Sequence, residues 1–331
     1  MIREAIKLVV ERKELSSELA EGAMKEIMNG TATPAQIAAL LTALRVKGET
    51  TMEIIAFAKV MRKFCEHINP KGTLVDTCGT GGDSKKTFNV STAAAFVAAG
   101  AGVKIAKHGN LSVTSKCGSA DVLEELGVNL DLEPQQVERC IEQIGIGFMF
   151  APNFHPAMKH ALPVRKELGI RTVFNLLGPL TNPANAGAQV LGVFDPGLTE
   201  TLAEVLRGLG TRHALVVHSE GMDELGLGKT KVSELKNGQI ETYFLDAGEL
   251  GFKNKDIQES ESSAETILRI LKGAKGPERD IVVLNAATTI YVGGRAETIK
   301  EGVGLAENSI DSGKALEKLN LLRRFEADGH T

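Results

Sequence analysis

A change in hydrophobic patterning near residue 70 constrains the fold of this 331-residue chain more than any other feature of its sequence. Before that point, residues 1–67 carry Ala, Leu, Ile and Met at helical spacing and predict helices only. After Pro70, short apolar segments typical of strands alternate with helix-length segments. We therefore expect an α/β chain with a small all-helical domain over residues 1–67 and a larger α/β domain over residues 70–331.

The helical part carries clear start and stop signals. Residues 33–36 read as a capping box with Pro at the first helical position, and the helix that begins there is expected to end at Gly48. Residues 50–53 start the next helix in the same way, and the Asn-Gly pair at 29–30 ends the preceding one. Later helices around residues 156–170 are further candidates to pack on this domain.

In the second part, strand and helix candidates follow one another in regular order. This alternation predicts a mostly parallel sheet with helices on both faces. Two alternating runs around Asn237-Gly238 predict a β-hairpin, and the apolar run 281–292 predicts a buried helix. The expected strands cover residues 74–76, 103–106, 147–150, 188–193 and 214–219. The expected helices cover residues 91–100, 121–126, 134–144 and 156–168, with another that ends at residue 209.

Composition excludes several classes of protein. The net charge of −4 argues against nucleic acid or an anionic membrane as the main partner. The longest apolar stretch, residues 93–103, is about half of the ~20 residues that a membrane span needs, and the N-terminus has no signal-peptide core. The cysteines lie far apart without a C-x-x-C pair, which indicates thiols in a reducing compartment. We therefore expect a soluble, cytoplasmic protein.

A glycine-rich segment at residues 76–83 follows the first expected strand and precedes a helix that opens at residues 89–92. A strand, a glycine loop and a helix N-terminus together present backbone N–H groups to a phosphate. Lys85 and Lys86 add positive charge nearby. The segment fits neither the G-x-x-x-x-G-K-[ST] nor the G-x-G-x-x-G pattern, and glycine turns that bind nothing are the alternative.

A second polar loop follows the next expected strand. Residues 107–110 read Lys-His-Gly-Asn, and residues 112–119 add four small hydroxyls, another Lys and another Gly. Ligands of open α/β sheets bind beyond the carboxyl ends of strands. Two such loops on successive strands could hold a ligand with two phosphate centres, whereas the alternative is a solvated, hydroxyl-rich loop.

Acidic and basic residues also follow later strands. Asp223 and Glu224 come after the strand that ends near residue 219, and acids beside phosphates repel unless a divalent cation such as Mg²⁺ lies between them. Arg165 could pair bidentately with a carboxylate or could be a surface residue. The histidines at 108, 155 and 160 lack the spacing of a metal site.

At these residues the sequence resembles the anthranilate phosphoribosyltransferase family, over nearly its whole length and in the family's order. Two departures are Leu111, where the family usually has Arg, and Cys117, where Ser is common. The matching segments are residues 79–83, 89–92, 107–110, 115–124, 165–169, 174–183 and 223–224.

The resemblance implies a nucleoside phosphorylase/phosphoribosyltransferase-like fold and a specific reaction. The enzyme would transfer the 5-phosphoribosyl group from phosphoribosyl pyrophosphate to the amine of anthranilate, in tryptophan biosynthesis. It would use two Mg²⁺ ions per active site and form a homodimer through the helical domain. A glutamine amidotransferase subunit of anthranilate synthase would be a possible partner.

The resemblance also assigns residues to three tasks. Donor binding would fall to Gly79, Gly82, Asp83, Thr87, Asn89, Val90, Ser91, Thr92, Lys107, Ser115 and Ser119. Anthranilate binding would fall to Gly79, His108, Asn110, His155 and Arg165. The metal ligands would be Ser91, Asp223 and Glu224.

The implied chemistry needs no strong base. An aryl amine is neutral at pH 7 and has a free lone pair, so the harder task is the departure of pyrophosphate as the ribose carbon becomes oxocarbenium-like. Mg²⁺ and backbone N–H groups would stabilise the leaving charge, and the two domains would align the acceptor. We expect no covalent nucleophile.

Three other readings compete with this one. A pyrimidine nucleoside phosphorylase shares the architecture, but residues 112–121 match its signature poorly. A phosphoribosyltransferase of the other fold type would show two adjacent acids before its Thr-Gly-Gly loop, whereas here Thr77 follows Asp76. A non-catalytic, nucleic-acid-binding relative would show a basic surface and damaged anthranilate residues, whereas Asn110 and Arg165 are intact.

Overall fold

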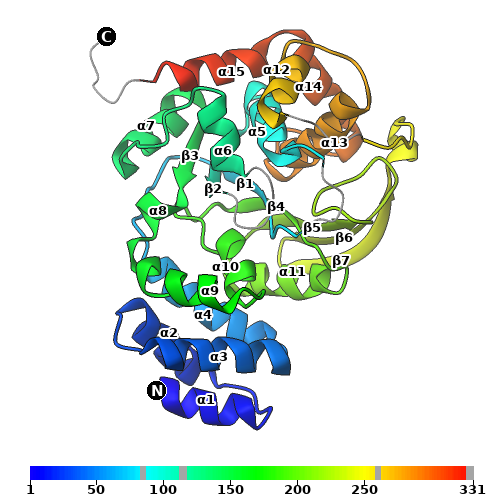
Figure 1. Cartoon of the computed structure of the whole chain (residues 1–331). Coiled ribbons are helices and arrows are strands. Elements are labelled where there is room, and N and C mark those ends of the chain that lie inside the picture. The colour runs from blue at the N-terminus through cyan, green and yellow to red at the C-terminus, as the bar shows by residue number, and fades with distance from the viewer. Residues whose placement is uncertain (83–86, 112–117, 258–261, 326–331) are drawn as a thin grey trace.

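The computed structural model describes residues 1–82, 87–111, 118–257 and 262–325 (Figure 1). Its N-terminal part is a set of helices at the bottom of the view. The predicted capping boxes at Thr33 and Thr50 are both present. Gly48, with a φ of 87°, ends the helix that begins after Thr33. These helices are α1 (Ile2–Val10), α2 (Ser17–Met28), α3 (Pro34–Lys47) and α4 (Thr51–Lys63).

A buried carboxylate ties the loops of the helical part together. Glu53 is fully buried and accepts hydrogen bonds from the backbone N–H groups of Leu15, at 2.9 Å, and Thr50, at 2.8 Å. The ammonium of Lys47, itself nearly buried, lies 2.9 Å from the same carboxylate. One side chain therefore joins the α1–α2 loop to the turn between α3 and α4.

The second part is built on one sheet of seven strands in the order β3-β2-β1-β4-β5-β6-β7. The first five are parallel, and β6 and β7 form the predicted antiparallel hairpin, with positive φ at Asn237 and Gly238. The mostly parallel sheet is thus confirmed. The strands are β1 (Leu74–Gly79), β2 (Lys104–Gly109), β3 (Ile146–Phe150), β4 (Ala188–Gly192), β5 (His213–Ser219), β6 (Lys229–Lys236) and β7 (Gln239–Asp246).

Helices cover both faces of the sheet (Figure 1). The Ala-rich α5 lies against β1 and β2 on the upper face and is covered in turn by α13, α14 and α15, which its small side chains allow to approach closely. The upper helices are α5 (Val90–Gly100), α6 (Ser119–Glu125), α7 (Pro134–Ile144), α12 (Ser263–Leu271), α13 (Pro277–Val292), α14 (Ile299–Asp311) and α15 (Lys314–Arg323). Below the sheet lie α9 (Leu162–Leu168), α10 (Phe174–Leu180) and α11 (Leu198–Gly208).

The apolar side chains form two cores, one on each side of the sheet. On β4 and β5, Val190 and Leu215 point into the upper core, whereas Leu191 and Val216 point into the lower one. This is the alternation that a strand imposes on successive side chains. The lower core continues without a break into α1–α4, and Val164 of α9 belongs to it. The helical part therefore packs on the underside of the sheet through a shared core.

The helix expected over residues 156–168 is wrong in one respect. The structure forms a 3₁₀ segment at Pro156–His160 and a separate helix, α9, that begins at Leu162. Pro163 lies in the first turn of α9, where its missing N–H does no harm. It could not lie within one continuous helix without losing a hydrogen bond and meeting the carbonyl four residues before it.

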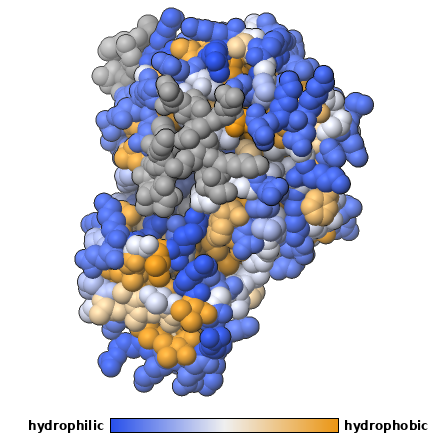
Figure 2. All heavy atoms as spheres, turned by 45° about the vertical axis from the view of Figure 1, so that its right-hand side comes forward, coloured by the Kyte–Doolittle hydropathy of each residue, from blue (hydrophilic) through white to orange (hydrophobic). Residues whose placement is uncertain are grey.

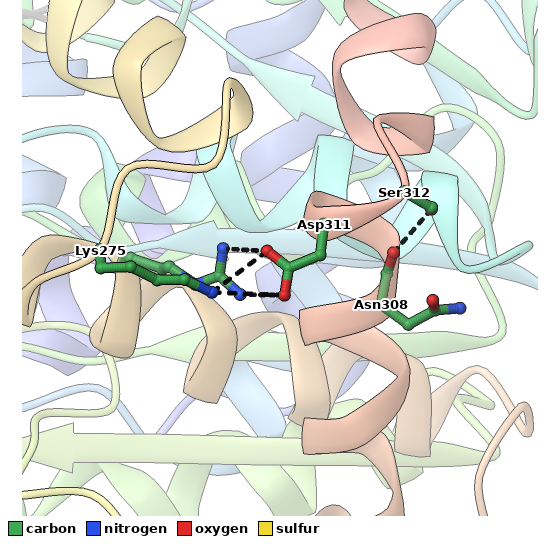
Figure 3. Close-up of polar contacts among 5 residues, drawn as sticks. Lys275, Asn308, Asp311 and Ser312 are labelled. Carbon is green, nitrogen blue, oxygen red and sulfur yellow. Dashed lines mark hydrogen bonds and ion pairs between the residues drawn. The ribbon is translucent and has the colours of Figure 1, made fainter.

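An ion-paired carboxylate joins two helices of the upper face. Asp311, the last residue of α14, accepts bonds from Arg279 of α13 at 2.7 and 3.0 Å, and the ammonium of Lys275 lies 3.2 Å away (Figure 3). Arg279 lowers the pKa of the Asp311 carboxyl. The side chain of Arg279 is buried although it is charged, so this pairing fixes how α13 and α14 cross.

Among the described helices, none is long and apolar enough to span a bilayer.

We predict that Glu53→Gln destabilises the chain by about 3–5 kcal/mol, because it leaves the nearly buried Lys47 ammonium without its ion-pair partner. Chemical denaturation measures the change. Gln36→Ala is the matched control, because it breaks the equivalent capping box of α3 at the surface and should cost about 1 kcal/mol. Equal losses in the two variants would contradict the role given to Glu53.

Candidate active site

The strand order places a crevice at the carboxyl ends of β1 and β4. From β1 the sheet extends through β2 and β3 on one side and through β4 and β5 on the other. The direction of the strand order therefore reverses between β1 and β4. Ligands of open α/β sheets bind at such a point. Gly79 of β1 pairs with Gly192 of β4 at this edge. A Cβ at Gly79 would overlap the Asp223 carboxylate, and one at Gly192 would overlap the Asp223 backbone. The two glycines thus admit Asp223 across the strand ends.

The glycine turn after β1 is held from two sides. The N–H of Gly81 donates to the Asp223 carboxylate at 2.8 Å. On the other side, Arg171 donates to the carbonyls of Thr80, at 3.2 Å, and Gly81, at 3.0 Å. Gly81 and Gly82 have φ angles of 67° and 95°, which side-chain-bearing residues rarely adopt. Asp83, the next residue expected to bind the phosphoribosyl donor, lies outside the described residues.

Lys107 of β2 is buried and faces the start of α5. Its ammonium donates to the Thr77 carbonyl and to the Ser91 hydroxyl, the latter at 3.2 Å. Burial lowers the pKa of Lys107, and the negative charges of Asp76 and Glu224 act in the opposite direction. The structure therefore brings the predicted residues Ser91, Lys107 and Glu224 into one electrostatic neighbourhood.

In the first turn of α5, several residues that were expected to bind the phosphoribosyl donor make contacts within the protein. The Thr92 hydroxyl donates to the Asn89 side chain at 2.6 Å, and the backbone N–H of Asn89 donates to the Ser263 hydroxyl at 3.2 Å. The side chains of Val90 and Thr92 are buried. Thr87 is half-buried at the edge of a pocket described below. These side chains shape the turn that begins the helix.

The second loop is described only at its two ends. A Cβ at Gly109 would overlap the hydroxyl of Ser119, so the predicted donor ligand Ser119 lies against the end of β2. Asn110 is exposed, and its side-chain oxygen accepts a bond from the N–H of Leu111 at 2.8 Å. Ser115 and the other residues of 112–117 lie outside the described residues.

Two buried imidazoles lie side by side near the crevice. The ring centroids of His108 and His155 are 5.0 Å apart. Nε2 of His108 is buried without a hydrogen-bond partner among the described residues, and neither ring nitrogen of His155 makes a hydrogen bond of ordinary geometry within them. Burial lowers the pKa of His108 to about 3 and that of His155 to about 4. Both rings are therefore neutral at pH 7 and have polar atoms that a ligand could satisfy.

Arg165 is held as a cation with free donors. It lies half-buried on α9, with its guanidinium carbon 5.3 Å from the centroid of the Phe174 ring. Burial lowers the pKa of Arg165. Its guanidinium has no hydrogen-bond or ion-pair partner within the described parts of the chain, so its fork of N–H groups can accept a carboxylate.

A pocket of about 520 Å³ opens beside the carboxyl end of β5, next to the site. Sequence analysis missed this pocket and also Arg171, because neither follows from a motif. Arg171 is adjacent to the glycine turn only through folding, since 90 residues separate it from Gly81. The pocket is lined by Thr87, Ser219, Glu220, Met222, Gly226, Leu227, Gly228, Lys229, Asn254, Lys255, Asp256, Ile257 and Ile281.

Comparison with known proteins identifies the family. Residues 3–65 match the "Glycosyl transferase family, helical bundle domain" and residues 71–316 match the "Glycosyl transferase family, a/b domain". Anthranilate phosphoribosyltransferase of Methanocorpusculum labreanum is 57% identical over 97% of each chain. The chain belongs to the anthranilate phosphoribosyltransferase family. The family's enzyme from Acetivibrio thermocellus is 56% identical over 98% of this chain and 96% of its own.

Solved structures of the family agree with the fold. The anthranilate phosphoribosyltransferase of Thermus thermophilus superposes with a TM-score of 0.92 at 45% identity, covering 97% of this chain and 98% of its own. The yeast enzyme, in complex with PRPP and Mg, superposes with a TM-score of 0.87 at 29% identity, over 98% and 97% of the two chains. The family and fold expected from the sequence are confirmed, and the chain is a transferase.

We predict that stability falls as the pH drops from about 6.5 towards 4. The pKa values of His108 and His155 are lower in the folded chain than the ordinary 6.5, so the unfolded chain binds more protons in this window. Each imidazole should contribute a slope of about 1.4 kcal/mol per pH unit. Denaturation of His155→Gln between pH 4.5 and 7.5 should show a shallower slope than the wild type. His160→Gln is the control, and an unchanged slope in His155→Gln would contradict the prediction.

Proposed function

We propose that this chain catalyses transfer of the 5-phosphoribosyl group from phosphoribosyl pyrophosphate to anthranilate, in tryptophan biosynthesis. The observation that carries the proposal is the crevice between β1 and β4, where the glycine turn and Asp223 meet in a member of this family. Yeast relatives have been solved with PRPP and Mg and with 4-fluoroanthranilate, which supports both substrates. The products would be N-(5-phosphoribosyl)anthranilate and pyrophosphate.

The donor would lie against the two loops and the start of α5. The backbone of Gly79 and Gly82 would approach its phosphates, and the first turn of α5 offers a helix N-terminus. The Ser119 hydroxyl at the end of β2 would bind from the neighbouring loop. Lys107 supplies positive charge from below and orients the Ser91 hydroxyl. We propose the same task for Asp83, Thr87, Asn89, Val90, Thr92 and Ser115.

The residues at the strand ends fit Mg²⁺. Asp223 and Glu224 provide hard carboxylate oxygens, and Lys107, which donates to the Ser91 hydroxyl, has a pKa that burial lowers and the negative charge of Glu224 acts to raise. No cluster of three His, Cys, Asp or Glu side chains suited to a metal occurs among the described residues. Mg²⁺ commonly uses only one or two carboxylates together with substrate phosphates, so this donor set suits it. When bound, two such ions would neutralise the charge that builds on pyrophosphate.

The acceptor would be positioned by groups below and beside the crevice. Arg165, with its free guanidinium donors, would bind the anthranilate carboxylate. Asn110 and the backbone at Gly79 would lie near the amine, and the neutral rings of His108 and His155 would line the site. A neutral histidine pair suits this place because it adds no charge beside an anionic acceptor.

Catalysis would then depend on positioning. The N–C bond to the ribose forms as the C–O bond to pyrophosphate breaks, and the substituted amine releases one proton. The anthranilate amine is already neutral, so no side chain has to remove a proton before attack. Arg165 from below the sheet and the glycine turn above it would hold the two reactants in line.

Three wider properties are part of the proposal. Apolar surface gathers on the lower, helical part of the molecule, as Figure 2 shows. Val46 and Met52 of this part are more than half exposed, which favours a homodimer formed through the helices. We also propose a cytoplasmic location and a possible association with the amidotransferase of anthranilate synthase.

The phosphorylase and nucleic-acid-binding alternatives find no support among the relatives, which are named as anthranilate phosphoribosyltransferases at 51–57% identity.

We predict that the purified chain removes the fluorescence of anthranilate when phosphoribosyl pyrophosphate and Mg²⁺ are present. Omitting the donor should abolish the loss because no phosphoribosyl group is then present. Chelating Mg²⁺ should abolish it because the charge on the leaving pyrophosphate is then not neutralised. Uridine or thymidine phosphorolysis, run in parallel, tests the nucleoside phosphorylase alternative. Persistent anthranilate fluorescence in the complete mixture would refute the proposed reaction.

We predict that Arg165→Ala raises the KM for anthranilate about 10- to 100-fold, since a charge-assisted hydrogen bond contributes about 1.5–3 kcal/mol. The KM for phosphoribosyl pyrophosphate should change much less. Lys166→Ala, one position on and exposed, is the matched control and should leave both values unchanged. Equal weakening of both substrates by Arg165→Ala would refute its role with the carboxylate.

A further inference from the structure

Arg171 contacts the site from a segment that carries no binding motif. It lies between α9 and α10, and its guanidinium reaches the glycine turn after β1. A single Nη2 donates to two successive carbonyls, those of Thr80 and Gly81. One side chain therefore fixes the orientation of two neighbouring peptide units.

The orientation of those carbonyls determines where the N–H groups of the turn point. In a trans peptide the C=O and the following N–H point in opposite directions. In the Thr80–Gly81 unit, the C=O accepts a hydrogen bond from Arg171, and the N–H donates in the opposite direction to the Asp223 carboxylate. The Gly81–Gly82 unit also turns its C=O to Arg171, so the N–H of Gly82 points away from the guanidinium. That N–H has no partner among the described residues and is available to an anion.

Arg171 is itself fixed by the same turn. Its guanidinium carbon lies 3.9 Å from the centroid of the Phe194 ring, and the N–H of Phe194 donates to the Thr80 hydroxyl at 3.3 Å. A Cβ at Gly82 would overlap Nη1, so the turn and the guanidinium fit only because residue 82 is glycine. The arginine, the aromatic ring and the turn form one interlocked unit.

Stability alone does not account for this arginine. Its Nε is buried without a partner among the described residues, and burial lowers the pKa of Arg171. A half-buried guanidinium whose buried Nε is unpaired costs free energy. The facing Asp223 offsets part of this cost by raising the same pKa. The arrangement is thus more easily explained by what it does to the turn and to Asp223.

We propose that Arg171 is a positioning residue for the phosphoribosyl donor. It holds peptide units 80–82 so that the N–H of Gly82 faces the donor phosphates and the N–H of Gly81 holds the Asp223 carboxylate across the strand ends. The inference rests on the proposed function, which it deepens by assigning the orientation of the glycine turn to one side chain.

The test compares Arg171→Ala and Arg171→Lys with Arg62→Ala. Arg62 is a matched control, because it is also half-buried and donates to two backbone carbonyls, those of Leu180 and Leu209, away from the turn. Calorimetry with Mg²⁺ and inorganic pyrophosphate measures anion binding without turnover. Initial rates give KM and kcat for donor and acceptor, and thermal unfolding gives the stability of each variant.

We expect Arg171→Ala to weaken pyrophosphate binding and raise the donor KM at least tenfold, with the anthranilate KM at saturating donor changed less than threefold. Arg171→Lys, which keeps the charge but not the fork, should lie between it and the wild type. Arg62→Ala should lower the melting temperature with both binding values within twofold of the wild type. Loss of folded protein alone would lower kcat and leave the donor KM unchanged.

The proposal would be overturned if both Arg171 variants had a donor KM and a pyrophosphate affinity within twofold of the values for Arg62→Ala. If Arg171→Ala does not fold, a wild-type donor KM in Arg171→Lys overturns it by itself. A wild type that binds pyrophosphate without consuming anthranilate would instead refute the proposed function. The calorimetric comparison would then still decide whether Arg171 positions the anion-binding turn.

Discussion

The carboxylate of Asp223, lying across the ends of β1 and β4, is the constraint on which the site depends. A side chain at Gly79 would overlap this carboxylate and one at Gly192 would overlap the Asp223 backbone, and the carboxylate accepts the N–H of Gly81. In the proposed function, the negative charge of Asp223 would attract Mg²⁺ close to the point at which the N–H groups of the turn would bind phosphate. The strand order that brings β1 beside β4 is therefore also what makes a metal-dependent donor site feasible here.

The underside of the sheet provides the other half of the arrangement. Because the lower core runs unbroken from β4 and β5 into α1–α4, the helical part is packed against the sheet and not merely tethered to it. The same core holds α9 and α10, and so fixes Arg165 and its aromatic partner Phe174. The lower core thus sets the place of Arg165, the residue proposed to bind the acceptor carboxylate, whereas the loops proposed to bind the donor start at the ends of the strands.

Much of the fold could be predicted from local patterns. The capping boxes, the Asn-Gly hairpin and the strand-helix alternation each depend on residues within a few positions of one another, which the sequence displays directly. The single helix expected over residues 156–168 was wrong at Pro163, because the expectation did not take this proline as a helix boundary. The site motifs were readable for the same local reason, but the neutral, unpartnered histidine pair was not, because burial by distant segments creates it.

By itself, the sequence determined the class of fold, the two-part organisation and the position of the loops proposed to bind phosphate, since glycine spacing, caps and period are local properties of a chain. Tertiary structure alone decided how those loops are oriented. Arg171 reaches carbonyls 90 and 91 residues away, and Asp223 reaches an N–H 142 residues away. Hydrogen bonds of this kind fix the direction of each peptide dipole, and no pattern of neighbouring residues encodes them.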